Sequence, residues 1–244
     1  MNNIPAVTKN LIIINILIFF GNIVAARYGI SLDRYLSLHF FLSDYFNPAQ
    51  LFSYMFMHEG FSHLFFNMFA LFMFGPVLEQ TFGRQRYLSY YLICGIGAGI
   101  VQELVTGIHF FVLESGMSPD AIGHVLSDGV TTWQRHMNFA DPNMAALNAV
   151  LNTSTVGASG AIFGVLLAFG MLYPNSQMFV FPLPMPVRAK YFVVGYALLE
   201  LFLGLRNSVS DNVAHFAHLG GMLFGFIMIV YWRRKGRRHG SNNF

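Results

Sequence analysis

The sequence predicts an all-α, polytopic membrane protein in which a single domain over residues 1–244 forms a bundle of six transmembrane helices. Hydrophobic residues make up 55% of the chain and charged residues only 10%, and the mean hydropathy is +0.52. A soluble domain carries about a quarter charged residues, so this composition excludes one. The chain also contains six apolar segments, each close to the ~20 residues that a membrane helix needs. These segments are roughly 8–28, 60–80, 87–108, 157–174, 188–206 and 212–232.

The basic residues indicate how these segments cross the membrane. If the N-terminus is cytoplasmic and every segment crosses, ten Lys and Arg residues fall on the inner side and four on the outer side. The inner residues are Lys9, Arg84, Arg86, Arg188, Lys190, Arg233, Arg234, Lys235, Arg237 and Arg238, and the outer ones are Arg27, Arg34, Arg135 and Arg206. Cytoplasmic loops carry such an excess, which predicts six crossings with both termini in the cytoplasm. The first segment has no small-residue cleavage site, so we expect a retained helix rather than a signal peptide.

Two long connections lie outside in this topology. The first, about 29–59, is rich in Tyr and Phe, which is typical of a segment lying at the membrane interface. The second, about 109–156, is an insertion with an amphipathic stretch over Ala121–Trp133. We expect it to form short surface helices, and a role in contacting substrate stays open.

Cysteine and charge exclude several classes of site. Cys94 is the only cysteine, so neither a disulfide framework nor a cysteine metal site can form. The formal charge is +3, but the basic residues are scattered at segment ends and in one short tail. A nucleic-acid partner needs them gathered on one face, so we expect none.

Small residues recur every four positions in two of the segments and predict close packing between them. They are Gly160, Gly164 and Ala168 in the fourth segment, and Ala217, Gly221 and Gly225 in the sixth. Small residues at this spacing let two helix backbones approach closely. We therefore expect the fourth and sixth helices to be neighbours.

Polar side chains are costly inside the bilayer, so the few that occur there indicate function. They are His63, Asn67, Ser159, Glu200, His215 and His218. Counted from the outer helix ends, His63, Ser159 and His218 lie in one layer in the outer third of the membrane. Glu200 falls at about mid-depth of its segment.

This layer contains the groups that acyl transfer requires. A serine hydroxyl is a weak nucleophile, and His218 is the base that can activate Ser159 if the glycine faces pack together. The oxyanion formed next needs fixed donors, and the plausible ones are His63, Asn67 and the backbone N–H of Ser159. Because Glu200 lies too deep to orient His218, we expect a Ser-His dyad rather than a triad.

At these residues the chain resembles the rhomboid family of intramembrane serine proteases. The family's H-x-x-x-N, G-x-S-G and A-H-x-G-G motifs match His63 to Asn67, Gly157 to Gly160, and Ala217 to Gly221. The resemblance runs through the whole six-helix core. It departs in the first outer loop, which lacks the family's Trp-Arg pair, and in the longer loop after the third helix.

The resemblance implies roles for individual residues. Ser159 is the nucleophile, His218 the base and then the acid, and His63 and Asn67 belong to the oxyanion hole. Phe163, one turn after the serine, is expected to pack its ring on His218. The substrates are transmembrane proteins, and the protein is expected to span a bacterial cytoplasmic membrane without any cofactor or metal.

The glycines in and next to these motifs are expected to allow close packing of the fourth and sixth helices. Gly157, Gly160 and Gly164 are expected to let the sixth helix come close enough for His218 to reach Ser159, and Gly221 lies on the face of the sixth helix that carries His218.

Alternative interpretations remain. His58, Glu59 and His63 nearly match the zinc motif H-E-x-x-H. However, the two histidines are five residues apart instead of four, so on a helix they would lie on different faces. Glu200 alone is a weak sign of an ion-coupled transporter, and His215 is expected to be structural. The second candidate for the whole chain is a catalytically silent rhomboid-like protein that binds and retains membrane proteins.

A last expectation concerns Glu79 at the inner end of the second segment. The nearby basic residues Arg84 and Arg86 indicate a charged anchor at the membrane surface.

Overall fold

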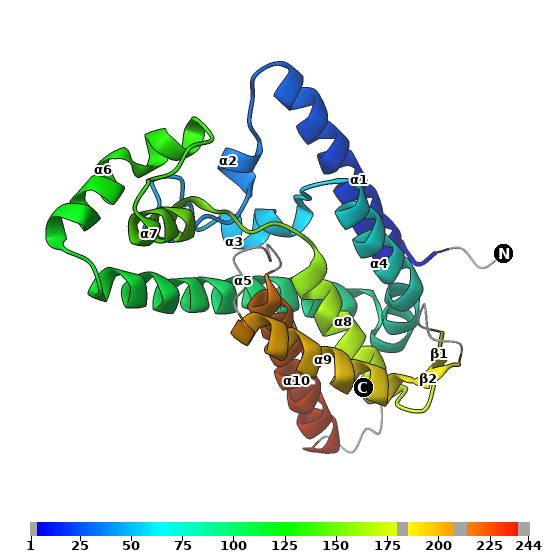
Figure 1. Cartoon of the computed structure of the whole chain (residues 1–244). Helices are drawn as coiled ribbons and strands as arrows, with labels where there is room; N and C mark the ends of the chain where they lie inside the picture. Colours follow the sequence, from blue (N-terminus) through cyan, green and yellow to red (C-terminus); the bar gives the residue numbers. More distant parts are fainter. Residues whose placement is uncertain (1–3, 180–184, 207–213, 239–244) are drawn as a thin grey trace.

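The computed structural model describes residues 4–179, 185–206 and 214–238, and these are almost entirely helical (Figure 1). The elements in chain order are α1 (Ala6–Arg27), α2 (Asp33–Leu36), α3 (Gln50–Ser53), the 3-10 helix η1 (Tyr54–Phe56), α4 (Phe61–Phe82), α5 (Arg84–Ser115), α6 (Pro119–Gln134), α7 (Pro142–Asn152), α8 (Ser159–Leu172), β1 (Gln177–Met178), β2 (Val187–Arg188), α9 (Ala189–Arg206) and α10 (His215–Arg238).

A helix lies over each of the six apolar segments that the sequence predicts. Four of them, α1, α4, α5 and α10, are long and apolar enough to cross a membrane. The helix α8 is shorter, with 14 residues, and α9 has 18 residues. The predicted start of the last segment, near residue 212, lies outside the described residues.

The helix α8 lies at the centre of the bundle, against α5 and α10 (Figure 1). A Cβ added at Gly164 would lie 2.5 Å from Cys94 Sγ on α5 and 3.0 Å from the backbone oxygen of Gly221 on α10. A Cβ at Gly221 would collide with the backbone of Gly160. The prediction that the fourth and sixth helices pack through small residues is thus confirmed, and the same face of α8 also packs on α5.

The helix α1 is fastened to α4 by the buried carboxylate of Glu79. Its two oxygens accept hydrogen bonds from the backbone N–H of Val7 at 3.0 Å and of Thr8 at 2.8 Å, and from the Thr8 hydroxyl at 2.9 Å. The first N–H groups of a helix have no partner within the helix and carry the positive end of its dipole, which suits a carboxylate. The expectation that Glu79 is a charged anchor at the membrane surface is therefore wrong, because its carboxylate is buried and caps α1.

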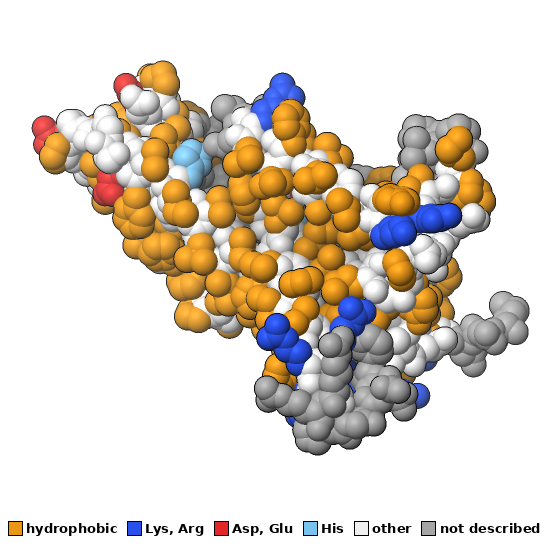
Figure 2. Space-filling view, turned by 90° about the horizontal axis from the view of Figure 1, so that it is seen from below, with side chains coloured by type: hydrophobic (Ala, Val, Ile, Leu, Met, Phe, Trp, Pro, Cys, Tyr) orange, Lys and Arg blue, Asp and Glu red, His pale blue; other side chains and the backbone are white. Residues whose placement is uncertain are grey.

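Large apolar side chains point outward from the bundle, as a membrane requires. On α4, the exposed rings of Phe61, Phe65 and Phe69 form a ladder, with stacked neighbours whose centroids lie 6.4 and 6.1 Å apart. Figure 2 shows apolar side chains over most of the face in view, with the few Lys and Arg side chains in separate patches. This arrangement agrees with an integral membrane protein.

The insertion after α5 forms two capped helices. The side chain of Ser118 accepts a hydrogen bond from Ala121 N at the start of α6, and that of Asp141 accepts from Asn143 N and Met144 N at the start of α7. A small apolar core joins these helices to α5 and to the segment between α2 and α3, and it is formed by Phe40, Phe110, Val125, Leu147 and Leu151. Figure 1 shows α6 and α7 at one end of α5, to the side of the main bundle.

Two details differ from the predicted all-helical bundle. The helix α5 has 32 residues and continues to Ser115, beyond the predicted end near residue 108. The strands β1 and β2 form an antiparallel pair between α8 and α9, with Gln177 opposite Arg188.

Candidate active site

Ser159 is the first residue of α8 and follows a turn that requires glycine. Gly157 has a φ of +124°, a backbone conformation that other residues rarely adopt. Its N–H donates to the backbone oxygen of Tyr54 at 2.9 Å, which ties the turn to η1. Because Ser159 opens the helix, its own N–H has no acceptor within α8.

The structure brings Ser159 and His218 together. Nε2 of His218 lies 2.8 Å from Oγ of Ser159, across the interface between α8 and α10. His218 is buried, with 8% of its surface exposed, and Ser159 is partly buried. This distance is within the range in which a histidine takes a proton from a serine hydroxyl.

The glycines around the site have different functions. Gly221 allows the close approach of α10 to the Gly160 backbone, as expected. Gly160 itself mainly allows the approach of α5, because a Cβ there would lie 2.4 Å from Cβ of Ala98 and 3.5 Å from the backbone oxygen of Ala217 on α10. Gly157 does not face α10, because a Cβ there would lie 2.8 Å from Nε2 of His63 and 3.6 Å from Oγ of Ser159. It instead shapes the turn and leaves room for the His63 ring beside the serine.

The ring of Phe163 lies flat on the imidazole of His218. The two centroids are 4.1 Å apart and the planes differ by 7°. Tyr196 of α9 covers Phe163 in turn, with ring centroids 4.9 Å apart. The predicted contact between Phe163 and His218 is therefore present, and it fixes the plane of the imidazole.

His63 and Asn67 lie one turn apart on α4. His63 borders the turn before Ser159, through its contact with the Cβ position of Gly157. Asn67 is buried, and its Nδ2 has no hydrogen-bond partner among the described residues. A buried N–H donor without a partner is costly, and such groups often serve function.

A carboxylate reaches His218, which contradicts the expectation that Glu200 lies too deep to orient this histidine. Oε2 of Glu200 lies 2.9 Å from Nδ1 of His218 and 2.6 Å from Nδ1 of His215. All three residues are buried, with 3 to 8% of their surfaces exposed. Ser159, His218 and Glu200 therefore form a continuous hydrogen-bonded row, and His215 joins it at the acid.

The predicted depth of Glu200 is wrong because it rests on the position of the residue within the whole segment 188–206. Glu200 lies only six residues before Arg206, the last residue of α9. At about 1.5 Å per residue that is about 9 Å from the helix end. His218 lies three residues into α10, so the long Glu side chain spans the remaining difference. Counting from the outer end of α9 would have revealed the contact.

Two clusters bear on a metal site. His58 precedes α4 while His63 lies within it, and their rings meet edge to face with centroids 5.1 Å apart, so they do not form the helical H-E-x-x-H arrangement. Glu200, His215 and His218 each offer a ligand atom, all within 4.8 Å of one another. These three are the described residues best placed to hold a divalent ion, and direct hydrogen bonds already join their atoms.

The buried His58 stands next to the site and lies outside the membrane-spanning helices. Burial, with a smaller contribution from neighbouring His63, lowers the pKa of His58 to about 4. Its ring is therefore neutral near pH 7.

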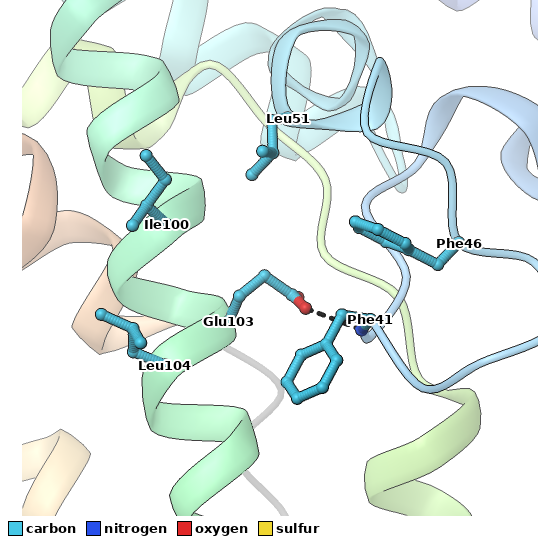
Figure 3. Close-up of a pocket in the computed structure, with 6 residues that line it drawn as sticks. All are labelled: Phe41, Phe46, Leu51, Ile100, Glu103 and Leu104. Atoms are coloured by element: carbon cyan, nitrogen blue, oxygen red, sulfur yellow. Dashed lines mark hydrogen bonds between the residues drawn. The ribbon is translucent and has the colours of Figure 1, made fainter.

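One apolar pocket of about 180 Å³ lies apart from these residues, between α5 and the segment that connects α1 to α4. Its lining comprises Phe41, Phe46, Leu51, Ile100, Glu103 and Leu104 (Figure 3). Within it, the carboxylate of Glu103 accepts a hydrogen bond from the backbone N–H of Phe41 at 2.9 Å. The pocket contains none of the predicted site residues.

Comparison with known proteins agrees with the motifs. A family model described as "Rhomboid domain" matches residues 46–235. Rhomboid protease AarA of Providencia stuartii is 28% identical over 236 residues, which is 92% of this chain and 72% of that protein. The putative rhomboid protease YdcA of Bacillus subtilis is 28% identical and covers 75% of this chain and 67% of its own length. RHOMBOID-like protein 2 of Arabidopsis thaliana is 36% identical, over 73% of this chain and 40% of its own length.

Proposed function

The chain belongs to the rhomboid family, and from this membership we propose that it is an intramembrane serine endopeptidase that cleaves transmembrane proteins in or beside their membrane segments. The observation that carries the proposal is the 2.8 Å contact between Nε2 of His218 and Oγ of Ser159. It joins the nucleophile and base that the chemistry needs, in the layer where a membrane substrate would be cut.

The reaction proceeds in two halves. His218 takes the hydroxyl proton as Oγ of Ser159 attacks the scissile carbonyl carbon. The tetrahedral oxyanion collapses, the C–N bond breaks, and His218 gives its proton to the leaving amine. A water molecule, deprotonated by His218, then attacks the acyl-enzyme ester and releases the second product with Ser159 restored.

The oxyanion is stabilised by donors around the serine. The backbone N–H of Ser159 is at the N-terminus of α8, where the helix dipole favours negative charge. The unpartnered Nδ2 of Asn67 supports its place in this hole, and the position of His63 beside the turn supports a second side-chain donor.

The membrane arrangement belongs to the same proposal. All six apolar helices cross the bilayer, with both termini in the cytoplasm, and the protein resides in a bacterial cytoplasmic membrane. The bias of Lys and Arg to one side supports the orientation, and the bacterial relatives support the membrane. Cysteine labelling of introduced surface positions from each side of inverted vesicles tests the orientation.

Fluorophosphonate labelling tests the activity. The probe should label wild type but neither Ser159→Ala nor His218→Ala, and both variants should fail to cleave a model transmembrane substrate. Ser115→Ala, at the exposed end of α5, is the control and should behave like wild type. Cleavage retained by Ser159→Ala would overturn the proposal.

Two alternatives make different predictions. A silent rhomboid-like binding protein has no need of the Ser159–His218 contact and would not react with the probe. A metalloprotease would lose activity with 1,10-phenanthroline, whereas the serine mechanism leaves cleavage unchanged after chelation.

A further inference from the structure

The carboxylate of Glu200 joins α9 to the catalytic histidine. The same oxygen, Oε2, lies 2.9 Å from Nδ1 of His218 and 2.6 Å from Nδ1 of His215. Glu200 is 3% exposed, so water cannot replace these contacts. A buried carboxylate is stable only where hydrogen-bond donors surround it, and the two imidazoles supply them.

These contacts determine which nitrogen of His218 carries the proton. An ionised carboxylate only accepts hydrogen bonds, so Nδ1 of each histidine is the N–H donor. In neutral His218, Nε2 then carries the lone pair, and this nitrogen faces Oγ of Ser159 at 2.8 Å. That tautomer is the one in which His218 can accept the serine proton.

The stack on Phe163 cannot make this selection by itself. A half-turn of the imidazole about its Cβ–Cγ bond leaves the ring plane, and hence the 4.1 Å stack, unchanged. The same half-turn moves Nδ1 away from Glu200 and replaces Nε2 by a carbon opposite Ser159. The contacts with Glu200 and Ser159 therefore distinguish the two orientations, and of these two partners only the carboxylate determines which nitrogen carries the proton, because a hydroxyl can either donate or accept.

We propose that Glu200 is a positioning residue of the protease, which holds His218 in the productive orientation and tautomer and stabilises the imidazolium formed when Ser159 loses its proton. His215 holds the carboxylate in place through its own bond to Oε2. This inference rests on the proposed serine protease function. It replaces the expected dyad by a triad in which the acid comes from α9.

The test compares two substitutions of a carboxylate by an amide. Glu200→Gln keeps the side chain's shape but removes its charge, and Glu103→Gln makes the same change in the pocket on α5. Each purified variant is assayed in detergent for kcat, KM, the rate of fluorophosphonate labelling and the thermal unfolding midpoint. Glu200→Gln should lower kcat and labelling on the order of 10²–10⁴-fold, as loss of a triad acid does.

The other measurements separate positioning from a structural role. KM and the unfolding midpoint of Glu200→Gln should stay close to those of the wild type. Glu103→Gln should match the wild type in kcat, KM, labelling rate and unfolding midpoint. If Glu200→Gln lowers the unfolding midpoint or raises KM while kcat is unchanged, Glu200 merely joins two helices and the inference is wrong. If wild type itself neither cleaves nor labels, the proposed function fails instead.

Nuclear magnetic resonance of ¹⁵N-histidine-labelled protein gives a test that does not depend on a variant. The spectrum of the wild type with neutral histidines should show His218 with its proton on Nδ1, the resonance being assigned by its loss in His218→Ala. A His218 signal with the proton on Nε2 would overturn the inference even if Glu200→Gln does not fold.

Discussion

Phe163 and His218 stack ring on ring, with centroids 4.1 Å apart and only 7° between their planes. Both residues come from helices that meet through glycines, so the stack is possible only because α8 and α10 approach closely. In the proposed reaction, the ring of Phe163 prevents the imidazole from tilting away from Ser159 while the proton moves.

Replacing Phe163 by Leu should therefore slow catalysis without preventing it. Aromatic pairs contribute about 0.5–1.5 kcal/mol beyond their buried area, which corresponds to a loss in kcat of roughly 2–12-fold. Phe163→Tyr keeps the stacked ring and should retain most of the activity. Phe169→Leu removes a ring of α8 that packs on Phe74 instead and should leave kcat unchanged. Equal losses in Phe163→Leu and Phe169→Leu would mean that general packing, not the stack, matters.

The glycine contact between α8 and α10 gives a second prediction. A Cβ at Gly221 would meet the backbone oxygen and carbon of Gly160, and backbone atoms cannot move aside as a flexible side chain can. Gly221→Ala should thus lower the unfolding midpoint in detergent and abolish fluorophosphonate labelling, by forcing His218 away from Ser159. The destabilisation should be about 1–3 kcal/mol, typical of overpacking.

Gly21→Ala is the matched control for this change. Gly21 also lies within a helix, α1, but a Cβ there meets nothing within 4 Å. Its substitution should leave labelling intact and keep or raise the unfolding midpoint, because Ala favours helix over Gly by about 1 kcal/mol. Normal labelling of Gly221→Ala would show that the two helices tolerate a wider spacing.

How much the sequence predicts depends on whether the feature is periodic along one helix. The neighbouring positions of α8 and α10 follow from small residues every four positions, and the meeting of Ser159 with His218 follows from counting turns from the outer helix ends. Both predictions depend only on the spacing of residues along one helix, so they can be made without a three-dimensional structure. The segments themselves follow from hydropathy for the same reason.

Three features of the structure, two of them in the candidate site, depend on geometry that the periodicity of a single helix does not indicate. The carboxylate of Glu200 contacts His218 because α9 ends close to where α10 begins. Placing Glu200 at about mid-depth of its segment does not indicate this contact. Glu79 caps α1, which is 71 residues away from it in the chain, although basic residues lie closer in sequence. The role of Gly157 depends on its φ of +124°. In each case the contact depends on where the backbone lies in space, which the sequence does not give directly.

The cap that Glu79 provides leads to a prediction about stability. Glu79→Gln should destabilise the protein by about 0.5–2 kcal/mol, since the amide has a single, uncharged acceptor oxygen and its NH2 group cannot accept a hydrogen bond from Val7 or Thr8. Chemical unfolding in detergent measures the change, and limited proteolysis should cut the N-terminal segment faster. Asp44→Asn, an acid exposed in the outer connection, should change neither. A stable Glu79→Gln protein with a protected α1 would contradict the cap.

His58 provides a prediction about pH. Burial first and the neighbouring His63 second lower the pKa of His58 from 6.5 to about 4, so the folded state disfavours its protonation. The unfolded chain takes up the proton near pH 6.5, and the folded chain only near pH 4. The stability that neutral His58 provides is therefore complete above about pH 6.5 and is lost as pH falls toward 4, by at most about 1.4 kcal/mol per pH unit.

Thermal unfolding of wild type and His58→Phe between pH 7 and pH 4 tests this dependence. The wild-type midpoint should fall with pH, and the variant should fall less steeply because it has no proton to take up at this position. His124→Gln, exposed on α6, should keep the wild-type slope, since its surroundings hardly change on unfolding. Parallel curves for wild type and His58→Phe would mean that other groups cause the acid sensitivity. A flatter curve for the variant would identify His58 as a buried neutral ring that stabilises the site only above its titration range.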